Sequence, residues 1–215
     1  MLGSKSCNTP ISVSEKLQKD LGNPFENPSL YRSVIGSLQY VTLTRPEIAF
    51  TVSKLSQFLA APTVLHWQAC KRLLRYLQGT APFGLQFHHS GSLNLTAYSD
   101  ADWGSDPDDR RSMGGYCMFL GSNLVSWSSK KQTLVSRSTA ESEYRALASA
   151  TSEVLWRTYL LRELKVQLDT SPLLHCDNKS VEALASNPKY HTRTKHIELD
   201  LHFIREHVAK KEFTI

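Results

Sequence analysis

The stretch LNLTAYSDADW, residues 93–103, decides how the second half of the chain folds. Apolar residues alternate with polar ones from Leu93 to Ala97, which is the period of a strand with one buried face. The stretch then brings two carboxylates, Asp100 and Asp102, to the end of that strand in a chain whose formal net charge is +5. It is therefore either an acidic surface turn or a place where a basic protein holds a metal ion.

The composition is that of a globular protein with room for one large domain or two small ones. Hydrophobic residues make up 40% of the 215 residues and charged residues 21%. The modest positive charge favours an anionic partner, with nucleic acid first. The four cysteines lack CxxC spacing, which argues against a zinc site or a disulfide framework and predicts reduced thiols. Without a long apolar run or a signal peptide, we expect an intracellular protein, cytoplasmic or nuclear, with no membrane partner.

The first part of the chain predicts a small helical domain. Residues 1–27 are polar and aperiodic, as in a linker or the tail of a larger protein, and residues 28–82 carry the 3.6-residue period of helices. A capping box at 44–47 is expected to open the second helix. The third is expected over 64–78 with these residues inward: Trp67, Leu74 and Leu77.

The second part, residues 90–215, predicts an α/β domain. Two strand candidates, 115–120 and 124–128, flank a Gly-Ser-Asn turn and form a hairpin. Ser138 and Glu141 make a capping box that opens a long helix to about residue 164. A short strand over 173–176, helical runs at 179–186 and 195–210, and the start of a strand at 212 follow. The expected architecture is a mixed sheet with flanking helices and an antiparallel start.

Three carboxylates lie at the ends of elements in this second part. Asp100 ends the first strand, Glu141 opens the long helix and Asp177 ends the later strand. Strand ends in an α/β sheet gather ligands, and converging carboxylates need a cation to offset their repulsion. Mg²⁺ with carboxylate ligands suits phosphate chemistry.

Each carboxylate also has a purely structural interpretation. Asp100 and Asp102 can belong to an acidic turn, with residues 106–109 forming a solvated loop. Glu141 can be the N3 partner of Ser138. Asp177 can cap the following helix. Spacing alone leaves both interpretations open.

The ordered motifs carry a more specific signal. The strings YSDADWGSDPDDRRSMGGYCMFLGSNLVSWSSKKQTLVSRSTAESEYRAL, HCDNKSVEALASNP and HTRTKHIELDLHFIREHV resemble the ribonuclease H domain of Ty1/copia-type retrotransposon polyproteins. The upstream string YRSVIGSLQYVTLTRPEIAFTVSKLSQFLAAPTVLHWQACKRLLRYLQGT is similar to the thumb or connection segment of the reverse transcriptase. The resemblance runs from about residue 23 to the end of the sequence.

This resemblance implies a ribonuclease H-like fold in which four acidic residues hold two Mg²⁺ ions, which Mn²⁺ can replace. The implied activity is cleavage of the RNA strand of an RNA/DNA hybrid, with one metal activating water and the other stabilising the leaving oxygen. The family's carboxylates fall on Asp100 in SDADW, Glu141 in STAESEY and Asp177 in CDN. Asp102 is expected on the same strand face as Asp100. Glu143, two positions from Glu141, is expected to point elsewhere.

Two features depart from the complete family pattern. No Tyr-x-Asp-Asp polymerase motif occurs, so the palm and fingers of the reverse transcriptase are expected as partner regions of the same polyprotein. The family's fourth carboxylate follows one more strand in a QLAD-like motif, whereas this sequence ends at Ile215. Asp200 and Glu198 are candidate substitutes, or belong to a solvated helix face. A domain truncated at its C-terminus, with impaired cleavage, is expected; the alternative is a non-catalytic nucleic-acid-binding remnant or a decayed fragment.

Residues for contact with the hybrid are fewer and less specific. Arg193 and Lys195 in HTRTKH, together with Asn178 beside Asp177, can contact phosphates or form an ordinary polar turn. Three tryptophans are expected to pack rather than to stack on bases: Trp103, Trp127 and Trp156.

Overall fold

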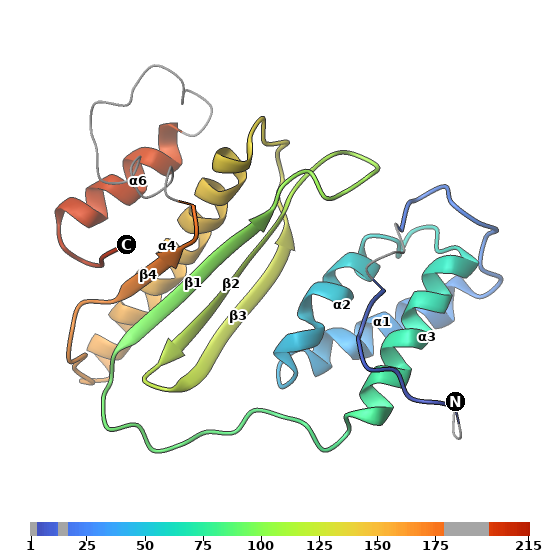
Figure 1. Ribbon diagram of the computed structural model, residues 1–215, viewed down its shortest axis with the longest axis horizontal. Coiled ribbons are helices and arrows are strands. Elements are labelled where there is room, and N and C mark those ends of the chain that lie inside the picture. Colours follow the sequence, from blue (N-terminus) through green and yellow to red (C-terminus); the bar gives the residue numbers. More distant parts are fainter. Residues whose placement is uncertain (1–3, 13–16, 179–197) are drawn as a thin grey trace. The chain divides into compact units, whose positions relative to one another are not determined.

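The computed structural model describes residues 4–12, 17–178 and 198–215. The chain divides into two compact units (Figure 1). The first comprises Met1–Leu85 with Pro107–Asp109, and the second comprises Gln86–Asp106 with Arg110–Ile215. Each unit has a hydrophobic core of its own.

The first unit is helical. It contains α1 (Pro28–Val41), a short 3₁₀ turn, η1 (Pro46–Ile48), α2 (Ala49–Ser56) and α3 (Val64–Gly79). Tyr31, Ile35 and Leu55 are buried at its centre. Leu17, from the stretch expected as a linker, is buried in the same core, and Ile11 and Phe25 pack against it.

Two sequence expectations for this unit are wrong in detail. No side chain caps the turn at residue 46; Arg45 stands at the N-cap position and its Nε donates to Glu47 Oε1 at 2.6 Å. The capping box lies instead at the start of α3, between Thr63 and His66, where a histidine replaces the usual Glu or Gln. The fully buried side of α3 is also displaced from the expected one and comprises His66, Ala69, Cys70, Leu73 and Tyr76, while Trp67, Leu74 and Leu77 are partly buried.

The second unit is built on a four-stranded mixed sheet in the order β3-β2-β1-β4. Its strands are β1 (Leu95–Asp102), β2 (Met113–Leu120), β3 (Asn123–Lys131) and β4 (Leu173–Cys176). The first three are antiparallel neighbours, and β4 lies parallel to β1. The mixed sheet with an antiparallel start is thus confirmed. Near the end of the sequence, Thr214 adds a single parallel bridge to Leu173.

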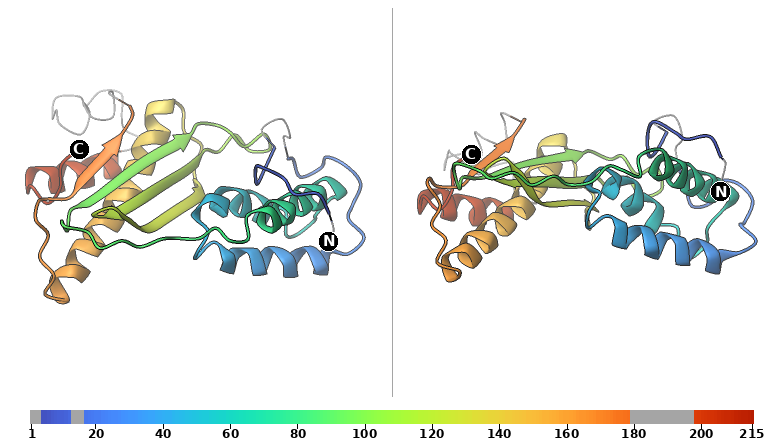
Figure 2. Two further views of the ribbon diagram at one scale, coloured as in Figure 1. Left: turned by 60° about the horizontal axis from the view of Figure 1, so that its bottom comes forward. Right: turned by 90° about the horizontal axis from the view of Figure 1, so that it is seen from below.

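Two helices cover one face of this sheet. Figure 2 shows α4 (Thr139–Glu163) and α6 (Glu198–Ala209) on the same side. Alternation along β1 turns Leu95 and Ala97 inward to the core that contains Tyr144 and Leu147 of α4. The fold class is therefore the expected α/β arrangement, a mixed sheet with flanking helices, and a small helical unit precedes it in the sequence.

Within the described residues, no helix combines the length and the apolar character needed to cross a bilayer.

Candidate metal centre

The carboxyl ends of two parallel strands place Asp100 beside Asp177. Ser99 of β1 pairs with Cys176 of β4, and the next residue of each strand is an aspartate. Adjacent strands lie about 4.8 Å apart, so Asp100 and Asp177 occupy neighbouring positions at the ends of the two strands. Asp100 lies on the exposed side of β1, as does Asp102, which confirms that these two aspartates share a strand face.

The third carboxylate of this group comes from the first turns of α4, and it is Glu143. Its ligand oxygen lies within 4.8 Å of Asp177 and of the Cys176 sulfur. Only 4% of its surface is exposed, and its Oε2 atom has no hydrogen-bond partner among the residues that the structure describes. The expectation that Glu143 points away from the other carboxylates is wrong.

Burial and like charge both act on Glu143. Burial raises the pKa of its carboxyl to about 7, and the charges of Asp100 and Asp177 act in the same direction. Hydrogen bonding from the Ala101 backbone opposes them. Among the described residues, no cation contributes to the pKa shift of this carboxylate, which is the condition that a bound metal ion would relieve.

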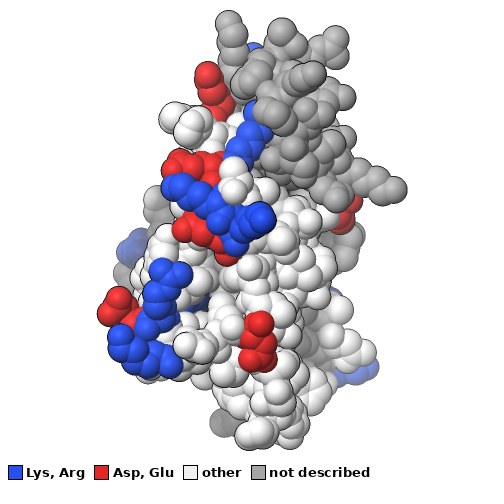
Figure 3. Space-filling view, turned by 90° about the vertical axis from the view of Figure 1, so that its left-hand side faces the viewer, with Lys and Arg blue, Asp and Glu red and all other residues white. Residues whose placement is uncertain are grey.

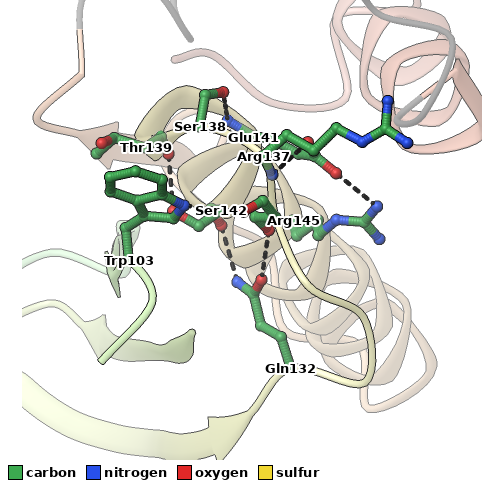
Figure 4. A network of polar contacts seen from close by, with 9 residues as sticks. Trp103, Gln132, Arg137, Ser138, Thr139, Glu141, Ser142 and Arg145 are labelled. Atoms are coloured by element: carbon green, nitrogen blue, oxygen red, sulfur yellow. Dashed lines mark hydrogen bonds and ion pairs between the residues drawn. The ribbon is translucent and has the colours of Figure 1, made fainter. Parts of the chain in front are cut away.

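Glu141, to which the sequence assigned this role, makes other contacts (Figure 4). Its Oε2 accepts a hydrogen bond from the Arg137 backbone at 3.0 Å, and its Oε1 pairs with the Arg145 guanidinium at 3.0 Å. Its own N–H donates to Ser138 Oγ at 3.2 Å. Both carboxylate oxygens are therefore satisfied at the helix N-terminus, as the capping interpretation predicted. The structure separates Glu141 from the group formed by Glu143, Cys176 and Asp177.

The acidic stretch that follows β1 is not uniformly solvated. Asp106 is 1% exposed, and its carboxylate pairs with Lys131 Nζ at 2.9 Å. The expectation of a solvated loop over 106–109 is wrong for Asp106, because this aspartate ties the loop to the end of β3.

The candidate substitutes for a fourth carboxylate lie elsewhere. Glu198 is exposed at the start of α6. Asp200 lines a cavity together with Arg145; burial raises the pKa of Asp200 and the Arg145 charge lowers it. The carboxylates whose charges act on Glu143 are Asp100 and Asp177. Neither Glu198 nor Asp200 belongs to the group of close ligand atoms found among the described residues, which comprises Glu143, Cys176 and Asp177.

The residues expected to contact nucleic acid are described only in part. Asn178 directly follows Asp177, whereas Arg193 and Lys195 lie outside the described residues. On the face shown in Figure 3, groups of lysine and arginine side chains border acidic ones, so that face carries mixed charge.

Two of the tryptophans expected to pack in the interior are half-exposed. Trp103 is 47% exposed and Trp156 is 56% exposed. The indole of Trp103 donates to the Ser136 carbonyl at 2.9 Å and so holds the segment that leads into α4. Because Trp103 follows the strand that carries Asp100, this bond fixes the two sides of the centre to each other.

The donor set fits a hard divalent cation. Glu143 and Asp177 offer carboxylate oxygens, the ligands that Mg²⁺ and Mn²⁺ prefer. Asp100 follows the paired residue on the neighbouring strand and its charge acts on Glu143, but it lies outside the group whose ligand atoms are within 4.8 Å of one another. Burial raises the pKa of the Cys176 thiol, and the nearby charges of Glu143 and Asp177 add to this, so the sulfur stays protonated and is a poor ligand for such an ion. The unpartnered Glu143 oxygen is the atom that a cation would satisfy.

Some known proteins are similar to this chain over nearly its full length. No family model matches the chain. It is 47% identical over 208 residues to the retrovirus-related Pol polyprotein from transposon RE2 of Arabidopsis thaliana, covering 97% of this chain and 14% of that protein. It is 39% identical over 224 residues to the corresponding polyprotein from transposon TNT 1-94 of Nicotiana tabacum, covering 100% of this chain and 17% of that protein.

Among solved structures, ribonuclease H1 from Halobacterium salinarum matches with a TM-score of 0.39 at 16% identity, covering 56% of this chain and 81% of that one. The chain spans about one seventh of the length of the Arabidopsis polyprotein that it matches.

Proposed function

Since the chain belongs to the family of retrovirus-related Pol polyproteins of copia-type transposons, we propose that its second unit is a ribonuclease H that uses divalent metal to cleave the RNA strand of RNA/DNA hybrids. The observation that carries the proposal is the Glu143 Oε2 atom, which is buried near Asp177 and accepts no hydrogen bond from the described residues. In this proposal Glu143 takes the role that the sequence alone gave to Glu141.

The three carboxylates have a common role in this proposal. Asp100, Glu143 and Asp177 would hold Mg²⁺ or Mn²⁺ at the carboxyl ends of β1 and β4. When bound, the metal lowers the pKa of coordinated water and stabilises charge on phosphate oxygens. Asp100 lies on the exposed strand face, so a phosphodiester can approach from solvent, whereas the buried Glu143 is rigidly held by α4.

The remaining residues act by positioning. Glu141 fixes the first turn of α4 through Arg137 and Arg145, and this turn carries Glu143. In this proposal Asn178, which follows Asp177 in the sequence, contacts the hybrid. The reverse transcriptase regions of the same polyprotein are the proposed partner, because the relatives extend far beyond the matched segment.

A cleavage assay with an end-labelled RNA/DNA hybrid and Mg²⁺ or Mn²⁺ tests the proposal. We expect Asp100→Asn, Glu143→Gln and Asp177→Asn each to lower the cleavage rate by about 100-fold or more, since each removes a metal-binding charge. Glu141→Gln is the matched control from the same helical turn and should reduce the rate by less than about tenfold, through helix stability alone.

Two results would contradict this assignment. Equal losses of cleavage rate for Glu141→Gln and Glu143→Gln would mean that both substitutions act through the N-terminus of α4, and not through loss of a metal ligand at Glu143. Binding of the hybrid that weakens with salt but yields no product at any metal concentration would favour the non-catalytic nucleic-acid-binding alternative.

A further inference from the structure

The candidate metal centre contains one atom that ribonuclease chemistry with Mg²⁺ does not use, the sulfur of Cys176. This residue ends β4, and its Sγ lies within 4.8 Å of ligand oxygens from both Glu143 and Asp177. Cys176 is partly exposed, so an ion can reach it from solvent. The sulfur is therefore one of the potential ligand atoms of the candidate metal centre.

A lone cysteine or a group of acids is not by itself a metal site, but a second observation points to a ligand here. Glu143 is 96% buried, and its Oε2 atom has no hydrogen-bond partner within the described part of the chain, while its carboxylate belongs to the same group. Leaving a buried carboxylate oxygen unsatisfied is costly unless a cation completes it.

We propose that Glu143, Cys176 and Asp177 form a second binding mode of this centre, which captures a thiophilic divalent cation, Zn²⁺ or Cd²⁺, in competition with Mg²⁺. The ligand set is one thiolate and two carboxylates, with a fourth position left for water, as in open zinc sites. Coordination displaces the thiol proton to water, and no other bond is made or broken.

The geometry suits this class of ion. Tetrahedral bonds of about 2.0–2.3 Å place neighbouring ligand atoms about 3.5 Å apart, so the three atoms need to move together by only about 1 Å. Thiolate ligands select Zn²⁺ over Mg²⁺, and Zn²⁺ also binds mixed sites more tightly than Mn²⁺ does. The captured ion would occupy two of the three carboxylates that the nuclease needs. The binding mode stands on these contacts alone, whereas its inhibitory effect rests on the proposed function.

The direct test uses Cd²⁺ alone and the ultraviolet charge-transfer absorption of a cadmium–thiolate bond. Titration of the metal-free protein should produce this band, and Cys176→Ser should remove most of it and weaken Cd²⁺ binding by at least about 10–100-fold. Cys117→Ser is the matched control, because Cys117 is also half-buried with a thiol pKa raised by burial, but lies on β2. An undiminished band in Cys176→Ser would overturn the proposal.

A second measurement needs no variant and so does not depend on folding of the mutant. Alkylation of the unmodified protein, followed by mass spectrometry of each cysteine peptide, should be slowed by Cd²⁺ at Cys176 and unaffected at Cys117. Equal labelling of Cys176 with and without Cd²⁺ would overturn the proposal.

Hybrid cleavage by the unmodified protein separates the two proposals. Cd²⁺ binding at Cys176 without any Mg²⁺-dependent cleavage supports this site and contradicts the nuclease function. Mg²⁺-dependent cleavage by a protein that does not bind Cd²⁺ supports the nuclease function and contradicts the cysteine site.

Discussion

Two glutamates in one turn of α4 differ in what surrounds them. Residues two positions apart in a helix point about 200° away from each other, so Glu141 and Glu143 cannot face the same neighbours. Glu141 meets a backbone N–H and a guanidinium, which both stabilise its charge. Glu143 meets Asp100, Asp177 and the protein interior, which all oppose its charge. Glu141 therefore stabilises the helix, whereas the charged form of Glu143 lowers the stability of the folded protein.

This contrast predicts opposite effects of two conservative substitutions in metal-free protein. Glu143→Gln removes a buried, unpartnered charge and should raise the free energy of unfolding by about 1–3 kcal/mol at pH 8, because its pKa of about 7 leaves it ionised there. Glu141→Gln should lower the same quantity by about 1 kcal/mol. Urea unfolding in EDTA measures both.

Added Mg²⁺ provides the control for this experiment. It should stabilise the unsubstituted protein and leave Glu143→Gln nearly unchanged, since the substituted site has lost a ligand. If Glu143→Gln destabilised the metal-free protein as much as Glu141→Gln does, the description of Glu143 as a strained site residue would have to be given up.

The sequence predicts the two strand aspartates better than the helix glutamate, and the reason is physical. Asp100 and Asp177 each end an alternating or apolar run, and parallel pairing of such strands brings their ends together. Glu141 and Glu143 both lie in a turn that is buried on all sides, so the 3.6-residue period does not distinguish them. The capping pattern Ser-x-x-Glu then favours Glu141, whereas the structure brings Glu143 to Cys176 and Asp177. Only the three-dimensional neighbours identify Glu143.

At the scale of elements, α3 shows how one buried side chain can set a helix boundary. His66 is fully buried and stacks on Phe58 with ring centroids 3.8 Å apart. Its Nδ1 accepts a hydrogen bond from the Thr63 backbone at 2.9 Å, which leaves Nε2 to donate to the Gln18 carbonyl at 3.1 Å. The neutral ring is therefore required, and burial lowers the pKa of His66.

The helical unit should consequently lose stability in mild acid. Because the pKa of His66 is lower in the folded state than in the unfolded chain, its contribution is complete above about pH 6.5 and is lost as the pH falls through the lower, folded value. Hydrogen exchange of amides in residues 64–79, compared at pH 7.5 and pH 5.5 after correction for intrinsic rates, measures this loss.

A single substitution isolates the cause of that loss. His66 is the only histidine among residues 1–85, so His66→Gln should make the protection of α3 independent of pH in this range. A pH effect that persisted in His66→Gln would place its origin outside this ring.

At the scale of the whole molecule, the two cores predict two separable units. Each unit buries its own apolar residues, and the exposed residues 81–84 follow α3. Limited proteolysis should therefore cut first in the stretch 81–87, which carries few buried side chains and no regular structure beyond a turn. Mass spectrometry of the early fragments tests this.

The fragments themselves give the decisive result. Two persistent fragments, one ending and one beginning near that stretch, with unchanged helical circular dichroism, are expected. Degradation of both units at equal rates without an intermediate would mean that neither core sustains its unit alone.

The pairing of Ser99 with Cys176 also determines when the centre forms as the chain folds. The hairpin of β2 and β3 joins residues close in sequence, whereas β1 and β4 close a loop that contains both of those strands and all of α4. Closing so long a loop is slow, because its entropy is lost before the contacts that compensate it are made. A chain still emerging from the ribosome can therefore build its hairpin and much of its helix while its aspartates remain apart. The proposed nuclease would gain its cutting site only in the final stage of folding, after β4 has been synthesised.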